Sequence, residues 1–148
     1  DDFLFHSDFY TGLQSYGDNW EALSVRILNP DGSRFWDWAT HGGPRGHVLL
    51  DYTDDDDHVY ITGGLILLKA EVADRVKWDD GRGFYQGEDL DFSARLRKSG
   101  IRPSFNRHST TTHDDGRYTM VVYPVGRQMR QRSTELGIPV RWSAPTPR

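Results

Sequence analysis

The sequence predicts a single domain of the mixed α/β class, with a mixed sheet flanked by helices. Three observations favour this class. Residues 23–28 place Val25 and Ile27 on one face with Arg26 between them, as a strand does. Residues 59–68 form the most apolar run of the chain, which is typical of a buried strand. Residues 88–98 carry apolar side chains at helical spacing.

In the first half of the chain we expect a helix or turn over 8–16 and the strand over 23–28. Asn29-Pro-Asp-Gly32 is a strong turn sequence, after which residues 33–38 are expected to return as a second strand. Residues 39–47 contain several glycines and Pro44, and they are expected to form a loop.

A short strand over 48–52 is expected next. Four acids at 54–57 lack the alternating ligand spacing and the glycine of a calcium loop, so a solvated loop is favoured there. In the second half we expect the buried strand over 59–68, a short helix over 70–76 and a longer helix over 88–98. One or two strands over 102–112 and a basic helix over 125–136 should follow. Gly100 predicts a left-handed end to the longer helix.

Composition excludes several classes of protein. The net charge of −4 and the scattered arginines offer no basic face, so no nucleic-acid partner is expected. The chain has no cysteine, which excludes disulfides, zinc–thiolate sites and thiol catalysis. No apolar run has the length of a membrane span and the N-terminus has no signal-peptide pattern, so a cytoplasmic protein is the default expectation.

Two neighbouring carboxylates, Glu88 and Asp89, stand where a glycine-bearing loop turns into the longer helix. Gly83 and Gly87 allow the close backbone approach and unusual torsions that a ligand site needs. The dipole and free N–H groups of a helix N-terminus stabilise a negative charge and hold it in place, which suits a base that must be aimed. Plain helix capping is the alternative, and it would account for one acidic residue here.

Residues 78–100, which contain this pair, resemble the acceptor-side signature of family 2 glycosyltransferases. These are inverting enzymes of the GT-A fold, a nucleotide-sugar-binding α/β domain. Residues 62–68 are similar to the small-residue turn and apolar strand that precede the signature. Asp1-Asp2 stands where the family's metal-binding Asp-x-Asp-type segment would end. His113 follows a strand, where many members place a histidine that helps to hold the metal-diphosphate.

The resemblance is good over residues 60–115 and loose over the first forty. It implies a GT-A-like fold and a metal-dependent transfer of sugar from a nucleotide-sugar donor to a hydroxyl of a carbohydrate or other acceptor. Asp89 is then the catalytic base and Glu88 binds acceptor hydroxyls or orients the loop; the reverse assignment stays open, because sequence does not distinguish neighbouring acids. The expected cofactor is Mn²⁺ or Mg²⁺, since both favour oxygen ligands and Mn²⁺ also accepts imidazole.

By the same resemblance Asp2 and His113 are the expected metal ligands, with Asp1 second. The residues expected to bind substrate are Asp1, Gly64, Trp78, Tyr85, Gly87 and Arg117. The aromatic residues Trp78 and Tyr85 would either stack on a sugar face or pack under the helix, and both alternatives stay open.

His108 and His113 lie five residues apart, so on a regular strand they point to opposite faces and only one can face the site. His113 is chosen because a loop sequence follows it. The other histidines, His6, His41, His47 and His58, are expected to be loop or surface residues.

The resemblance also predicts that only the C-terminal, acceptor-side half of a GT-A domain is present, as part of a larger transferase or as a shortened relative. The domain would span 1–142, with a frayed tail over 143–148. A half-domain exposes apolar strand edges, so its missing N-terminal half or a second copy is the expected partner.

Transfer of single sugars is favoured, because the nearest match to the Gln-x-x-Arg-Trp motif of processive synthases, at 128–132, lacks the Arg-Trp pair. Two alternatives compete with a transferase. One is a non-catalytic carbohydrate- or partner-binding module of the same fold. The other is a metal-dependent hydrolase or nuclease, and the lack of a basic groove counts against a nuclease.

Overall fold

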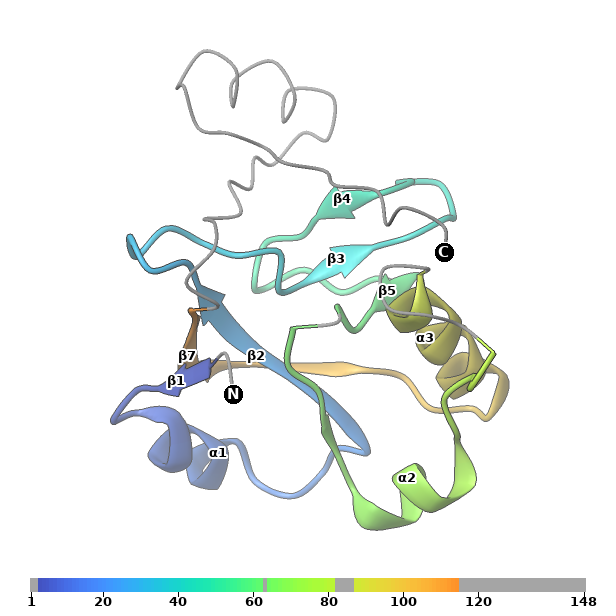
Figure 1. Cartoon of the computed structure of the whole chain (residues 1–148), viewed down its shortest axis with the longest axis horizontal. Coiled ribbons are helices and arrows are strands. Elements are labelled where there is room, and N and C mark those ends of the chain that lie inside the picture. Colours follow the sequence, from blue (N-terminus) through green and yellow to red (C-terminus); the bar gives the residue numbers. More distant parts are fainter. Residues whose placement is uncertain (1–2, 63, 82–86, 115–148) are drawn as a thin grey trace, which may run out of the picture.

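A computed structural model describes residues 3–62, 64–81 and 87–114. Over these residues the chain is a mixed α/β structure with seven strands in two sheets and three helices (Figure 1). The mixed α/β prediction is therefore confirmed. The basic helix expected over 125–136 and the tail from 143 lie outside the described residues.

The larger sheet has the strand order β1-β7-β2-β6. Its centre is the parallel pair β2 (Ala22–Leu28) and β7 (Ser104–His113). At the edges, β1 (Phe3–Phe5) is antiparallel to β7 and β6 (Leu67–Leu68) is antiparallel to β2. Because β2 is central, both its faces are covered and nearly all of its residues are buried.

The smaller sheet is antiparallel, in the order β4-β3-β5, with β4 at Val48–Leu49, β3 at Ala39–Thr40 and β5 at Val59–Tyr60. The prediction of one strand over 59–68 is wrong. That run leaves the smaller sheet after Tyr60 and joins the larger one as β6. The run is buried over 59–62, whereas the described residues from 64 onward, including β6, are only half-buried.

Two further expectations need correction in this part of the chain. Residues 33–38 make a single bridge, Leu28 to Arg34, instead of a second strand. The segment 39–47 opens with β3 before it becomes a loop. The turn at 29–32 is confirmed, since the Gly32 N–H donates to the Asn29 carbonyl at 2.9 Å.

The helices are α1 (Phe9–Tyr16), α2 (Ala70–Arg75) and α3 (Glu88–Lys98), close to their predicted ranges. Helix α3 ends as predicted: Gly100 has a φ of 77°. The Gly100 N–H donates to the Arg97 carbonyl and the Ile101 N–H to the Leu96 carbonyl, each at 3.0 Å. This is the Schellman arrangement, with Ile101 and Leu96 buried in one apolar cluster.

Strand β7 contains a bulge, although it is otherwise one strand. Its pairing with β2 passes from Val25–Asn106 directly to Arg26–Thr110, so residues 107–109 have no partner on β2. Helix α1 lies on this bulge at close range: a Cβ added at Gly12 would stand 2.3 Å from the His108 carbonyl oxygen. The Asn106 side-chain amide completes the contact by donating to the Gly12 carbonyl at 3.1 Å.

The core divides into three apolar clusters. The one relevant to function contains Ile27, Phe35, Trp36, Ala39 and Tyr60, with Phe3, Leu49, Leu65 and Leu90 packed against it, and we call it the central cluster. Trp38, Leu50 and Val59 belong to a separate cluster with Phe105. In the part of the chain that is described, no helix is long and apolar enough to cross a membrane.

Candidate functional site

The carboxylate pair lies at the start of α3. Gly87 precedes the helix in the left-handed conformation, with a φ of 74°, which a residue other than glycine adopts at a cost. Glu88 and Asp89 then occupy the first turn, and both are half-buried. One carboxylate oxygen of Asp89 accepts the Leu90 N–H at 2.8 Å. This bond is a capping contact within the first turn, since the N-cap residue, Gly87, has no side chain to supply one.

Packing against the smaller sheet fixes the position of this helix start, as Figure 1 shows where α3 lies beside β5. The buried Ser93 hydroxyl accepts the Ile61 N–H at 3.0 Å, just beyond β5. One turn earlier, Leu90 packs against the central cluster, which holds Trp36 and Tyr60. Asp89 therefore stands at the junction of α3 with the smaller sheet.

Next to this junction lies a hydrogen-bonded row of three rings, Trp36, Tyr60 and His47. The indole Nε1 of Trp36 donates to the Tyr60 hydroxyl at 2.5 Å. That hydroxyl lies 3.0 Å from Nε2 of His47. The Trp36 and His47 rings meet edge to face with centroids 4.9 Å apart. Trp36 and Tyr60 are buried whereas His47 is exposed, so the row runs from the core to the surface.

The electrostatics of the row involve Asp89. Burial lowers the pKa of His47, the charge of His41 lowers it further, and the charge of Asp89 opposes both. Burial also raises the pKa of the Tyr60 hydroxyl; the hydrogen bond from Trp36 opposes that rise and the charge of Asp89 adds to it. His47 is consequently neutral at neutral pH.

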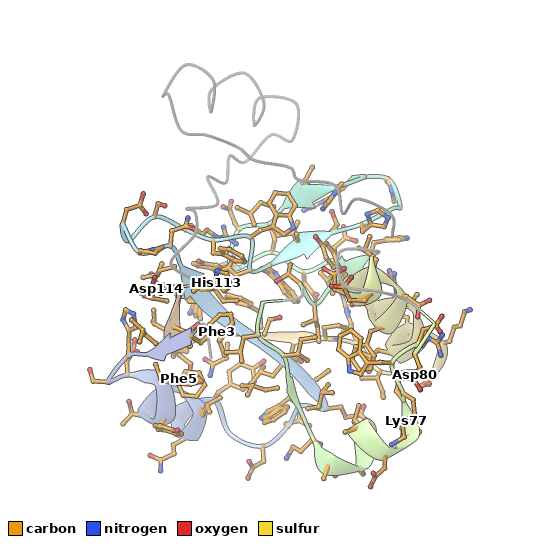
Figure 2. The ribbon with its side chains drawn as sticks, viewed as in Figure 1. Phe3, Phe5, Lys77, Asp80, His113 and Asp114 are labelled. Carbon is orange, nitrogen blue, oxygen red and sulfur yellow. The ribbon has the colours of Figure 1, made fainter. Side chains whose placement is uncertain are left out.

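At the other end of the central cluster is His113, the last residue of β7. It pairs with Phe3 across the β1–β7 ladder, and Figure 2 shows the two residues next to one another. Its ring lies 4.9 Å from Phe3 and 4.9 Å from Phe35, measured between centroids. His108, by contrast, is on the bulge and exposed. The bulge also removes the regular alternation on which the choice between the two histidines partly rested.

Gly64 shares the surroundings of His113. A Cβ added at Gly64 would stand 3.4 Å from Phe3 Cζ and 3.4 Å from Phe35 Cε1. The tighter contact would be with Ile27 Cδ1, at 3.2 Å, whereas the two ring contacts are ordinary van der Waals distances. Phe35 precedes Trp36 in sequence and both belong to the central cluster. The central cluster thus supports His113 and Gly64 at one end and the ring row beside Asp89 at the other.

Four of the expected site residues, Asp1, Asp2, Tyr85 and Arg117, lie outside the described residues. Trp78 is described, and its ring stacks on Phe92 of α3 with centroids 4.1 Å apart and planes 9° apart. The Trp78 ring packs on α3 through one face, and the residue is 42% exposed. It therefore packs on the helix, as one alternative expected, and also presents an exposed surface.

The metal assignment rests on the donor set. Among residues 3–62, 64–81 and 87–114, no three His, Asp or Glu side chains are grouped so as to hold a metal ion. An imidazole with one or two carboxylates suits Mn²⁺ as a donor set, and the expected carboxylates, Asp1 and Asp2, lie outside the described residues. The types of residue expected as ligands therefore fit the cation.

His47 and His41 were expected to be loop or surface residues, and both are exposed and outside the strands, as expected; the hydrogen bond of His47 was not foreseen. His47 is at the surface but bound to Tyr60, and the His41 ring lies 5.3 Å from it. Trp36 and Tyr60 also gave no local functional signal. The only available sign was the concentration of rings at 35–38 in an otherwise polar chain.

No model of a known protein family, no curated protein and no solved structure matches this chain.

Proposed function

We propose that the chain carries the acceptor side of a metal-dependent inverting glycosyltransferase with a GT-A-like fold. It would move a single sugar from a nucleotide-sugar donor to the hydroxyl of a carbohydrate or other acceptor. The observation that carries the proposal is the position of Asp89, a half-buried carboxylate in the first turn of a helix that packs against the smaller sheet. A carboxylate held in one orientation is what deprotonation of an acceptor hydroxyl requires.

In the proposed reaction, Asp89 takes the proton of the acceptor hydroxyl as its oxygen attacks the anomeric carbon of the donor. The new carbon–oxygen bond forms as the bond to the diphosphate breaks, and the nucleoside diphosphate leaves with the bonding electron pair. Glu88, the next acid in the same turn, binds acceptor hydroxyls or orients the loop. The reverse assignment of the two acids is the competing version.

Asp2 and His113 would hold the divalent cation, with Asp1 second. When bound, Mn²⁺ or Mg²⁺ supplies positive charge that offsets the charge on the leaving diphosphate. The rings of Phe3 and Phe35 hold the His113 imidazole in place. Gly64 leaves the space beside these rings free of a side chain.

A carbohydrate-binding module without turnover is the second candidate. The ring row of Trp36, Tyr60 and His47 favours it, because the row is complete within the described residues and needs no nucleotide-binding half. This candidate predicts sugar binding without transfer.

The transferase is tested by replacing the proposed base. Asp89→Asn keeps the shape of the side chain but removes the base, so kcat for transfer from a panel of nucleotide sugars with Mn²⁺ should fall by about 10²- to 10⁴-fold. Donor binding and the melting temperature should stay the same. Undiminished transfer by Asp89→Asn would sink the base assignment.

Asp91→Asn is the matched control, since Asp91 is on the same helix and pairs with Arg95 at 2.6 Å. That variant should keep its transfer rate. An equal loss in both variants would mean that the helix start, rather than Asp89 itself, is sensitive to substitution.

The metal assignment has its own test. His113→Ala should weaken the Mn²⁺-dependent binding of a nucleoside diphosphate, measured by calorimetry with and without Mn²⁺. The exposed His108 provides the control, and His108→Ala should bind as the unmodified protein does. Unchanged Mn²⁺ dependence in His113→Ala would make His113 a structural residue of the central cluster.

A further inference from the structure

Two arginines beside the central strand of the larger sheet are not saturated by groups of the protein. Among the described residues, the buried side-chain polar atoms without a hydrogen-bond partner are Ser24 Oγ, Arg26 Nε and Arg34 Nη2. A buried donor without a partner is costly, and a bound water or ion is one reason why such a donor persists. Where these three atoms lie relative to one another decides whether they mark a common site.

The three residues share one face of the larger sheet. Side chains alternate along β2, so Ser24, Arg26 and Leu28 project to the same side. Arg34 is the antiparallel bridge partner of Leu28, and residues directly opposite each other project to the same side as well. Ser24 is fully buried, whereas Arg26 and Arg34 are half-buried, so the two arginines are the members that a molecule from solvent can reach.

His113, the proposed metal ligand, lies on the other face of this sheet. Ile27 is the neighbour of Arg26 on β2 and therefore projects to the opposite side. Thr111 pairs with Ile27, and His113 follows Thr111 by two residues, so His113 lies on the side of Ile27. A molecule bound by the arginines is thus separated by the sheet from the proposed metal ligand, and its binding is independent of the proposed reaction.

One aromatic ring holds the two guanidinium groups near each other. Arg34 Cζ lies 3.9 Å and Arg26 Cζ 5.6 Å from the centre of the Tyr52 ring, both within the range of a cation–π contact. The Tyr52 ring stacks on Phe105 with centroids 4.8 Å apart, and Phe105 is the β7 partner of Ser24. The two arginines are therefore held at the same ring, over the face of the sheet that contains Ser24.

The charges around this ring do not balance. The fully buried Asp37 carboxylate binds Arg34 Nε at 2.9 Å. No carboxylate of the described residues pairs with Arg26. Burial raises the pKa of the Tyr52 hydroxyl, so this side chain is neutral at neutral pH. Two guanidinium groups, each with five N–H donors, thus face a single carboxylate, and one positive charge is left without a counter-ion.

We propose that Arg26 and Arg34 bind one monovalent anion, either a small ion such as chloride or the carboxylate group of a larger molecule. Both ligands bring a single negative charge and accept N–H donors. A phosphate monoester fits less well, because its charge of about −1.5 to −2 would leave a surplus of negative charge next to the buried Asp37.

The first experiment follows the arginine Nε–Hε signals of the ¹⁵N-labelled protein during separate titrations with sodium chloride and sodium acetate. The Arg26 and Arg34 signals should shift along a saturating curve, with a dissociation constant on the order of 1 mM for about two charge-assisted hydrogen bonds. Arg97, which is half-buried and donates to a backbone carbonyl at 3.4 Å, is the internal control and should respond only to ionic strength.

The two salts distinguish the sources of the anion. Saturation with both salts supports a site for any small monovalent anion, and saturation with acetate alone supports a carboxylate site. A linear drift of all arginine signals with both salts would reduce the effect to screening and overturn the proposal. Tighter binding of inorganic phosphate than of acetate would overturn the assignment of a single negative charge.

The second experiment uses the variant Arg26→Gln, which removes the unpaired charge. Because a bound anion stabilises the folded state, the melting temperature of the unmodified protein should rise with the better of the two salts and then level off. In Arg26→Gln the affinity deduced from this rise should be about tenfold weaker or lower, the loss of one charge-assisted hydrogen bond. Arg97→Gln is the matched control and should behave as the unmodified protein does. Equal curves for Arg26→Gln and the unmodified protein would show that Arg26 binds no anion.

Discussion

Two polar clusters contain the consecutive residues Trp36 and Asp37. They differ in whether they reach the surface of the protein. Asp37 is fully buried, and its two carboxylate oxygens accept three hydrogen bonds, from the Ile27 N–H at 3.0 Å, the Tyr52 hydroxyl at 2.8 Å and Arg34 Nε at 2.9 Å. The Arg34 guanidinium also lies 3.9 Å from the centre of the Tyr52 ring. The Trp36 cluster instead ends at the surface, in the imidazole of His47.

The two clusters therefore differ in how far they reach toward the surface. Both carboxylate oxygens of Asp37 are occupied by groups of its own chain, and these bonds hold β2 against the segment that follows the turn. The Trp36 cluster ends instead in an exposed imidazole, of which one nitrogen is bonded to Tyr60. The presence of a polar group in the core is therefore less informative than whether its hydrogen-bonding capacity is used up.

The largest effect should come from breaking the closed cluster. Asp37→Ala leaves the half-buried Arg34 and the Tyr52 hydroxyl without their partner, and it should lower the free energy of unfolding by about 3 kcal/mol, the low end for a buried pair because Arg34 is partly exposed. Urea titration followed by circular dichroism measures it. A loss below about 1 kcal/mol would mean that this cluster contributes no more to stability than an ordinary surface ion pair. The contrast drawn between the two clusters would then be wrong.

A matched pair of tyrosines gives a smaller and sharper test. Tyr52→Phe removes a hydrogen bond to a carboxylate and should cost about 2 kcal/mol of unfolding free energy. Tyr60→Phe removes two bonds between neutral groups, one with Trp36 and one with the exposed His47, and should cost about 1 kcal/mol in total, the low end for two such bonds. The same urea titration applies to both. If the order of the two costs is reversed, the Trp36 cluster contributes more to stability than the Asp37 cluster.

The smallest effect concerns pH. Burial and the charge of His41 lower the pKa of His47 below its ordinary value of 6.5, against the opposing charge of Asp89. The unfolded chain then takes up the proton first as the pH falls. The contribution of His47 is fully present above pH 6.5 and is lost as the pH drops through its lowered folded-state pKa.

This contribution is measured as the difference between the unfolding free energies of the unmodified protein and His47→Asn over that pH range. The unmodified protein should lose more stability than the variant on acidification. Identical pH profiles would show that protonation of His47 is not coupled to folding.

Local sequence signals predicted the elements whose formation depends on near neighbours. The end of α3 is an example, because Gly100 alone can take the left-handed torsion cheaply and Ile101 then closes on Leu96. The apolar run over 59–68 was misread because its composition shows that it is buried but not which sheet buries it. Tyr60 and Leu67 pair with strands that lie far apart in the sequence.

The candidate site divides in the same way. Glu88 and Asp89 could be found from sequence, since a carboxylate pair at a helix start is a local pattern. His47 could not, because its significance depends on Tyr60, thirteen residues away, and on Trp36, and these meet only when the smaller sheet forms. An isolated histidine near glycines has no periodicity that distinguishes it from a surface residue.

The bulge in β7 gives this strand a place where its length can change. Residues 107–109 have no partner on β2, so a residue added or removed there can be absorbed without altering the pairs that Thr110 and Thr112 make with Arg26 and Leu28. Any such change must still clear the backbone of α1 at Gly12. Natural variants should therefore vary in length within 107–109 and keep their register from position 110 onward.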